Sequence, residues 1–289
     1  MIESTTGRTA TLLLRCPDRQ GIAAGVAEWI ASNGGNIVHA EQHFDRAADV
    51  FFQRVEFVPS AEFERIEDIQ SSLEPVATRF SMSVDVRFSD QPQRIAILCS
   101  KQGHCVHDLV SRWKLGEMPG ELAMVISNHE THRATTEAMG VPFHHLPVTA
   151  DSRAEQETAM LRLLADANID LMIMARYMQI LSDRVITDYP ERVINIHHSF
   201  LPAFPGGKPY HQAYDRGVKL IGATAHYATV DLDEGPIIEQ DVQRVNHRHD
   251  PDDLVAHGRD LERVVLARAV KAHLDHRVMV YDNKTVVFE

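Results

Sequence analysis

The sequence predicts an α/β protein with two domains, and three observations lead to this prediction. The chain has 289 residues, which is more than one small domain usually needs. Two different orders of strands and helices lie on either side of a polar, proline-containing break at residues 89–93. The composition, 44% hydrophobic and 24% charged, is ordinary for a folded globular chain. We therefore expect a small domain at residues 1–88 and a larger one at residues 94–289.

The first 88 residues predict a strand-helix-strand-strand-helix-strand unit. Alternating apolar residues and turn signals predict strands at residues 8–16, 37–44, 50–57 and 81–88. Apolar residues at helical spacing predict helices at residues 21–32 and 61–73, and Gly34-Gly35 ends the first of them. This order is typical of a ferredoxin-like antiparallel sheet with both helices on one face.

From residue 94 onward, buried strands alternate with helices. The run 94–99 (RIAILC) is almost entirely apolar, which is typical of a strand covered by helices on both faces. We expect further strands at residues 122–127, 143–146, 171–175, 193–196, 221–229 and 236–242, helices at 104–115, 131–139, 153–168, 182–188 and 251–275, and a hairpin at 277–289. Together these elements predict a doubly wound, Rossmann-like sheet.

The charge and the cysteines limit the partners and the compartment. The 29 Lys+Arg against 41 Asp+Glu give a net charge of −12, which disfavours nucleic acid and anionic membranes as partners. Three cysteines without a CxxC pair fit a reducing compartment. The sequence shows neither a secretion signal nor an apolar run long enough for a membrane span. We therefore expect a cytoplasmic protein.

The densest group of reactive side chains follows the strand predicted at 193–196. Asn195 and His197 point to the same side of that strand, and this donor pair suits a developing oxyanion. The strand predicted at 221–229 is followed by acidic residues, Asp231, Asp233 and Glu234, one of which suits a general base. Each residue alone also fits a cap, a structural histidine or a solvated turn, so the residues by themselves select no reaction.

The motif Asn195-Ile196-His197-His198-Ser199-Phe200-Leu201-Pro202, followed by Gly206 and by His226 and Asp233-Glu234-Gly235-Pro236, resembles the signature of the 10-formyltetrahydrofolate-dependent formyl-transfer enzymes. The resemblance covers about residues 94–250. It implies that Asn195, His197 and Asp233 are catalytic. The stretch Met174-Ala175-Arg176-Tyr177-Met178-Gln179-Ile180-Leu181-Ser182 resembles the family's folate-binding segment, which contacts the pterin through its main chain, although the family more often has Arg in place of Gln179. The substrate-binding residues that the resemblance implies are Met178, Gln179, Ile180, Leu181, Gly206, His226, Val230 and Asp231.

A metal is not expected. His104 and His107 are spaced like ligands on one helix face, but no cysteine or carboxylate in the sequence completes a set around them. We therefore expect no metal and no cofactor beyond the folate substrate.

The acceptor of the formyl group distinguishes the members of this family. Glycinamide ribonucleotide transferases have a Ser-Gly-x-Gly-Ser-Asn loop for the acceptor's phosphate after the first strand. Here the loop is Ser100-Lys101-Gln102-Gly103-His104-Cys105, and Lys101, Gly103 and His104 are its candidate acceptor-side residues. These changes damage the phosphate cradle, although Lys101 keeps ribonucleotide transfer open as an alternative. A tRNA acceptor is disfavoured because the chain is acidic and has no additional basic C-terminal domain.

The N-terminal unit resembles an ACT domain, a regulatory module that commonly binds amino acids. The resemblance is carried by Arg15-Cys16-Pro17-Asp18-Arg19-Gln20-Gly21-Ile22 and Gly34-Gly35-Asn36-Ile37. It implies an effector site at Asp18, Gly21, Asn36 and Ile37, where a helix N-terminus favours the carboxylate of an amino acid. The Asp18–Gly21 segment also fits a plain helix start. ACT sheets often pair edge to edge, so we expect a homo-oligomer, either a dimer or a tetramer.

An ACT domain ahead of a formyl-transfer domain is similar to the formyltetrahydrofolate deformylases over the whole chain. This implies a hydrolase that converts 10-formyltetrahydrofolate to formate and tetrahydrofolate, supplies formate to purine synthesis and balances the one-carbon folate pool. The second alternative is a non-catalytic protein that senses amino acids and folate. The intact set Asn195, His197 and Asp233 disfavours it, because a pure binder does not require these residues.

Overall fold

The computed structural model describes residues 7–149, 151–203 and 209–289. The chain divides into two compact units, one made of residues 1–92, 276–279 and 286–289 and the other of residues 93–275 and 280–285. We expected the second domain to continue to residue 289, but parts of the C-terminal segment belong to the first unit. There Arg54 Nε donates to the carbonyl of His276 at 3.0 Å, and the backbone N–H of Glu289 donates to Glu41 at 3.1 Å.

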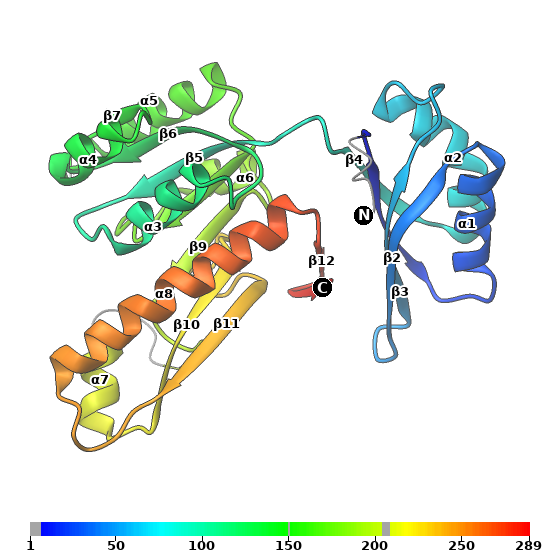
Figure 1. Ribbon diagram of the computed structural model, residues 1–289. Helices are drawn as coiled ribbons and strands as arrows, with labels where there is room; N and C mark the ends of the chain where they lie inside the picture. The colour runs from blue at the N-terminus through cyan, green and yellow to red at the C-terminus, as the bar shows by residue number, and fades with distance from the viewer. Residues whose placement is uncertain (1–6, 150, 204–208) are drawn as a thin grey trace. The chain divides into compact units, whose positions relative to one another are not determined.

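The first unit is a four-stranded antiparallel sheet with two helices (Figure 1). Its elements are β1 (Ala10–Pro17), α1 (Ile22–Ser32), β2 (Asn36–Asp45), β3 (Val50–Val58), α2 (Ile66–Phe80) and β4 (Ser83–Phe88). The strand order is β2-β3-β1-β4, so β2 and β4 are the edges. Leu12 and Leu14 of β1 pack with Trp29 of α1 and Leu73 of α2, which places both helices on one face.

Helix α2 begins later and ends later than the sequence predicted. We expected residues 61–73, but the helix runs from Ile66 to Phe80 and contains Pro75. Its start is fixed by the carboxylate of Asp68, which accepts from the backbone N–H and from the guanidinium of Arg65, each at 2.9 Å. Its last residue, Phe80, is buried against Cys16, Ile22 and Phe51, and this burial favours the extra turns beyond the proline.

The second unit is built on a seven-stranded sheet in the order β11-β10-β9-β8-β5-β6-β7. Its elements are β5 (Arg94–Cys99), α3 (His104–Lys114), β6 (Glu121–Ser127), η1 (Glu130–His132), α4 (Arg133–Ala138), β7 (Phe143–His145), α5 (Arg153–Asp166), β8 (Leu171–Ala175), α6 (Asp183–Asp188), β9 (Val193–His197), α7 (Pro209–Arg216), β10 (Leu220–Tyr227), β11 (Ile237–Arg244) and α8 (Pro251–Leu274). A hairpin of β12 (Val278–Tyr281) and β13 (Lys284–Val287) follows.

The sheet is mixed rather than wholly parallel. β7, β6, β5, β8 and β9 pair in parallel, whereas β10 is antiparallel to both β9 and β11. Sequence analysis predicted β10 and β11 as a strand pair but did not predict α7. That helix begins with Pro209, a residue suited to a first helical position, directly after a Pro- and Gly-rich stretch that resembles a loop.

The helices of the second unit cover both faces of its sheet. Side chains of α5 and α6 pack with Met172 and Met174 of β8 in one core cluster. The 24-residue helix α8 packs on β9, β10 and β11, together with α3 and α7 (Figure 1). β5 pairs with β6 on one side and with β8 on the other, so the winding reverses at β5. Open α/β sheets bind ligands at the carboxyl ends of the strands at such a point.

Among the described residues, no helix has both the length and the apolar character that crossing a membrane requires.

A glycine in α8 makes room for a tyrosine of α7, which yields a prediction. A Cβ at Gly258 would lie 2.0 Å from Cζ of Tyr210. We expect Gly258→Ala to lower the free energy of unfolding by about 1–3 kcal/mol through overpacking, although Ala is ordinarily the better helix former. Urea unfolding checks this. At the exposed Ala256, helix propensity alone favours Ala over Gly, so the control Ala256→Gly should also lower the free energy of unfolding. A Gly258→Ala protein that is more stable than the wild type would contradict the packing argument.

Candidate active site

Asn195, His197 and Asp233 lie together at the carboxyl end of β9. His197 Nδ1 is 3.2 Å from Oδ1 of Asp233, which stands in the turn between β10 and β11. Asn195 is the register partner of His226 on β10, and its Nδ2 lies 3.1 Å from Nε2 of His226. The structure therefore brings the three predicted catalytic residues and His226 into one cluster.

His226 orients the amide of Asn195. Its Nδ1 lies 3.0 Å from the carbonyl oxygen of Tyr227, and a proton on this nitrogen leaves Nε2 as an acceptor for the amide of Asn195. Burial lowers the pKa of His226, so its neutral form is favoured. The Asn195 oxygen thus faces away from His226, and one amide proton remains free for a ligand.

A close turn places the carboxylate of Asp233. Asp233 has the left-handed φ of 59°, and a Cβ at Gly235 would lie 1.8 Å from the carbonyl oxygen of Tyr227, so only glycine fits there. The hydrogen bond from His197 lowers the pKa of Asp233, which keeps its carboxylate ionised. Within the described part of the chain, Nε2 of His197 is buried and makes no hydrogen bond. This nitrogen can therefore donate to an oxygen of a bound ligand.

A cavity of about 220 Å³ adjoins this cluster. It is lined by Met174, Arg176, Tyr177, Met178, Gln179, Ile180, Asn195, Ile196, His197, His198, Leu232 and Asp233. Met178 and Ile180 are each 57% exposed, and such apolar side chains at a cavity mark a binding surface. The segment is held by Ser100, which accepts from the backbone N–H of Met178 at 3.0 Å, and by Arg153, which donates to the carbonyl of Ile180.

Several residues predicted to contact the substrate do not line this cavity. Leu181 is buried in the core cluster shared by α5 and α6, and Val230 and Asp231 are exposed. The predicted Gly206 lies outside the described residues. Lys101 and Gly103 lie beyond the cavity wall, with Gly103 packed on His132 and His107.

Sequence analysis included Arg176 in the stretch 174–182 that resembles a folate-binding segment, but assigned it no role, whereas the residue lines the cavity together with His197. Arg176 is 7% exposed and has φ of 63°, a conformation unusual for a residue with a side chain. The resemblance concerns main-chain contacts, so it gives no sign of this buried side chain.

A buried carboxylate on α8 connects to this arginine. Glu262 is 1% exposed, and its Oε2 lies 2.8 Å from His104 Nε2 and 3.4 Å from Arg176 Nε. Its Oε1 accepts from the hydroxyl of Tyr210 at 2.7 Å. Burial by itself would raise the pKa of Glu262, but the hydrogen bond from His104 and the charge of Arg176 outweigh it and lower the pKa.

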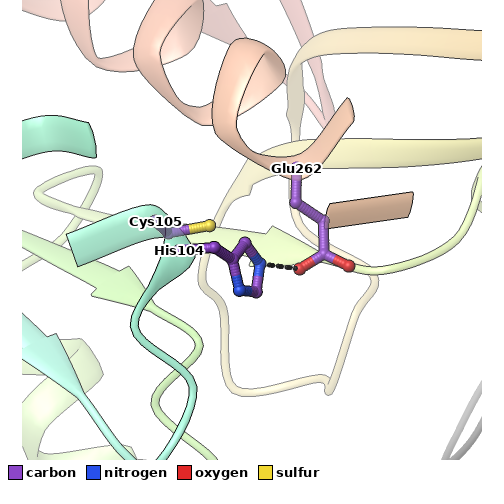
Figure 2. Close-up of side chains that lie close together, drawn as sticks. All are labelled: His104, Cys105 and Glu262. Carbon is purple, nitrogen blue, oxygen red and sulfur yellow. Dashed lines mark hydrogen bonds and ion pairs between the residues drawn. The ribbon is translucent and has the colours of Figure 1, made fainter. Parts of the chain in front are cut away.

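The expectation that no cysteine or carboxylate accompanies His104 is wrong. His104, Cys105 and Glu262 offer ligand atoms that all lie within 4.8 Å of one another, and Figure 2 shows the imidazole of His104 turned toward the carboxylate. The Glu262 oxygens are already engaged, and the guanidinium of Arg176 beside them disfavours a second cation. Burial also raises the pKa of the Cys105 thiol, and a neutral thiol is a poor ligand. We therefore interpret the cluster as a hydrogen-bonded network.

The structure does not bring the four predicted effector residues together within one chain. Asp18 and Gly21 follow the end of β1, where Pro17 pairs with Val50. Asn36 and Ile37 begin β2, where Asn36 pairs with Val58 at the opposite end of the sheet. The two pairs are separated because β1 and β2 run in the same direction on either side of β3. The sequences around Asp18 and around Asn36 both favour turns. Such sequences do not indicate at which end of the sheet the turn lies.

Known proteins resemble this chain over nearly its whole length. Residues 93–270 match the formyl transferase family. A formyltetrahydrofolate deformylase from Synechocystis is 52% identical over 281 residues, which span 97% of this chain and 98% of the relative. One from Bacillus subtilis is 47% identical over 278 residues, which span 96% of this chain and 93% of the relative.

Solved structures show the same relationship. A formyltetrahydrofolate deformylase from Pseudomonas syringae superimposes with a TM-score of 0.95 at 44% identity, covering 99% of this chain and 96% of its own. A glycinamide ribonucleotide transformylase from Symbiobacterium toebii reaches a TM-score of 0.65 at 30% identity, covering 68% of this chain and 95% of its own. The match to the transformylase thus leaves about a third of this chain without a counterpart.

Buried histidines make the stability of the protein depend on pH. Burial, followed by the charges of Arg176 and His197, lowers the pKa of His198 from 6.5 to about 3, and burial also lowers the pKa of His107 and His226. Between the two pKa values the unfolded chain binds a proton that the folded chain does not, so stability falls as the pH decreases below 6.5. Each such group contributes up to about 1.4 kcal/mol per pH unit.

We therefore expect Tm to fall between pH 7.5 and pH 5, and to fall less steeply in the His198→Asn protein. Differential scanning fluorimetry over this range measures both slopes. The control is His211→Asn, because His211 is exposed on α7 and its replacement should leave the slope unchanged. A Tm that rises on acidification would contradict the neutral state of the buried histidines.

Proposed function

The chain belongs to the formyl transferase family and, within it, to the formyltetrahydrofolate deformylases, and we propose that Asn195, His197 and Asp233 carry out its reaction. The protein is a hydrolase that converts 10-formyltetrahydrofolate and water to formate and tetrahydrofolate. The observation that carries the assignment of residues is the 3.2 Å contact between His197 and Asp233, with the buried Nε2 of His197 left for a ligand.

The formyl oxygen is held between two donors. Nδ2 of Asn195 and Nε2 of His197 donate to it, and both bonds strengthen as the oxygen becomes an oxyanion. The charge of Asp233 stabilises the protonated imidazole of His197. His226 does not contact the substrate in this scheme, because it acts through the amide of Asn195.

Water supplies the nucleophile. Its oxygen bonds to the formyl carbon while Asp233 accepts a proton from it, which gives a tetrahedral intermediate. The bond between this carbon and N10 then breaks, and N10 takes up a proton as it leaves. The products are formate and tetrahydrofolate, and the remaining proton passes to solvent.

The folate lies against Met178, Gln179 and Ile180. Two observations support this: all three residues line the cavity, and the apolar side chains of Met178 and Ile180 are exposed there. Backbone groups of this segment suit the hydrogen-bonding edge of a pterin, and such contacts do not depend on the side chain of residue 179. The larger remainder of the substrate extends into solvent past Val230 and Asp231, which are exposed.

The reaction requires no metal and no further cofactor, and it takes place in the cytoplasm, where its formate supports purine synthesis. The cation of Arg176 beside the Glu262 network supports metal independence. The free, buried state of Cys16, Cys99 and Cys105 supports a reducing compartment.

The first unit is an ACT-type regulatory domain that binds an amino acid. The β-α-β-β-α-β order and the antiparallel sheet support this fold. The effector carboxylate binds at the start of α1, beside Asp18 and Gly21. Asn36 and Ile37 lie at the other end of the sheet, so they complete the site only from a second copy of the chain. This arrangement requires a homo-oligomer, and the exposed edge strand β2 supplies a surface for it.

The catalytic assignment predicts the effect of one substitution. Asn195→Asp replaces a donor by a negative charge beside the oxyanion, so we expect kcat for formate release to fall by at least about 10²–10³-fold. A coupled formate assay with 10-formyltetrahydrofolate measures this. Asn246→Asp makes the same chemical change at an exposed residue after β11 and should leave kcat unchanged. Near-normal turnover of Asn195→Asp would refute the role of this residue.

The regulatory assignment predicts a ligand that acts through Asp18. When each amino acid is added separately, we expect at least one to raise Tm, because it binds only the folded state, and to change the rate of formate release. Asp18→Asn should abolish both responses without changing basal kcat. Asp85→Asn, an exposed residue on β4, is the matched control and should keep them. If no amino acid shifts Tm, the domain is not a sensor of this class of ligand.

A further inference from the structure

Arg176 occupies a strained and central position that hydrolysis as derived above does not use. Its φ of 63° is disfavoured for a residue with a Cβ and is ordinary for glycine. Its side chain is almost fully buried, although a guanidinium is among the groups least often buried. A strained backbone and a buried charge beside catalytic residues indicate a functional constraint.

Two partners, Gln102 and Glu262, hold this guanidinium. Nε of Arg176 donates to Oε1 of Gln102 at 3.0 Å in the loop after β5, and it lies 3.4 Å from Glu262 on α8. Glu262 is held in turn by His104 at 2.8 Å (Figure 2) and by the hydroxyl of Tyr210 at 2.7 Å. A side chain with this many partners has one position, so it forms a rigid wall of the cavity.

The Arg176 side chain lies on one side of Asn195 and His197. The segment 178–180, proposed to contact the folate, lies on the other side. Ile180 is fixed by Arg153 of α5, and Tyr177 packs in the cluster formed with α5 and α6. Glu262 belongs to α8, which packs with α3 and α7 on the opposite face of the sheet. Arg176 lies two residues before Met178, the first of the residues 178–180 proposed to contact the folate, and its side chain connects this segment to Glu262 on α8. Asn195 and His197 lie next to it on β9.

The volume of the cavity indicates which second substrate can bind beside the folate. Cavities that hold one small ligand usually measure about 300–1,000 Å³, whereas this one measures about 220 Å³. It has room for the reacting end of the folate and for a water molecule, whose share of liquid volume is about 30 Å³. A cavity of this volume is small for the folate and a second organic substrate together.

We propose that Arg176, held by Gln102 and Glu262, restricts the acceptor of the formyl group to water by closing the α8 side of the cavity against amines. The proposal rests on the catalytic role proposed above for Asn195, His197 and Asp233. With this side open, the nitrogen of a small primary amine attacks the formyl carbon, the bond from that carbon to N10 breaks, and the proton lost by the amine replaces the carbon on N10. The product is then a formamide instead of formate.

Replacement of Arg176 by glycine tests the proposal, because glycine removes the wall and accepts the positive φ without strain. We incubate the full-length protein with 10-formyltetrahydrofolate and increasing hydroxylamine or glycinamide, and quantify formate and the formylated amine. We expect the wild-type enzyme to produce formate at every amine concentration. In Arg176→Gly the ratio of formylated amine to formate should rise at least about tenfold, the lower end of what one pocket contact contributes to discrimination.

Two further variants distinguish the effect of side-chain bulk from the effects of charge and of impaired folding. Arg176→Gly leaves Glu262 without its cation, and an uncompensated buried charge is strongly destabilising. The double variant Arg176→Gly with Glu262→Gln removes both charges and should show the same product ratio with a higher Tm. Arg176→Met keeps most of the bulk without the charge, so it should still produce mainly formate.

The proposal fails if either glycine variant, folded by its Tm, consumes 10-formyltetrahydrofolate and forms only formate. It also fails if both folded glycine variants consume no folate, because Arg176 would then serve hydrolysis itself. A failure of the catalytic assignment would be detected by a different result, namely undiminished formate release by the Asn195→Asp variant that retains Arg176. The two results are therefore distinguishable.

Discussion

The pairing of β9 with β10 is the constraint on which the active site depends. Their antiparallel register sets Asn195 opposite His226, and the close return of the chain at Gly235 brings Asp233 back to His197. Because β10 runs antiparallel to β9, its last residue, Tyr227, pairs with Ile194, and the turn that follows folds back along the strand until Asp233 reaches His197. The site therefore combines side chains of β9 with a carboxylate from the turn between β10 and β11.

A second constraint is the burial of charge on the α8 face. Glu262 tolerates nearly complete burial because His104, Tyr210 and Arg176 together satisfy both of its oxygens. This network ties the loop after β5, the end of β8, α7 and α8 to one point beside the cavity. The same cation that stabilises Glu262 helps to keep His198 neutral, so the electrostatics of the network and of the catalytic strand are coupled.

Much of the fold was predictable because its signals are local. Buried strands such as β5 and β8 are continuous apolar runs, and the motif around Asn195 and His197 locates the strand of the proposed catalytic pair without any structure. The predictions were wrong where contacts between residues far apart in the sequence determine the local structure. Helix α2 continues past Pro75 because Phe80 is buried by β1 and β3, and α7 forms after a stretch that locally favours a loop.

The sequence by itself determined most of the order of elements, the family and the candidate catalytic residues Asn195, His197 and Asp233, because each of these is written in a short motif or a periodic pattern. Only the tertiary structure decided which residues surround them. Arg176 and Glu262 are 86 positions apart, and the stretch 174–182 that contains Arg176 gives no indication of its contact with Glu262. They meet because β8 and α8 pack at the same end of the sheet, and long-range packing of this kind leaves no local trace in a sequence.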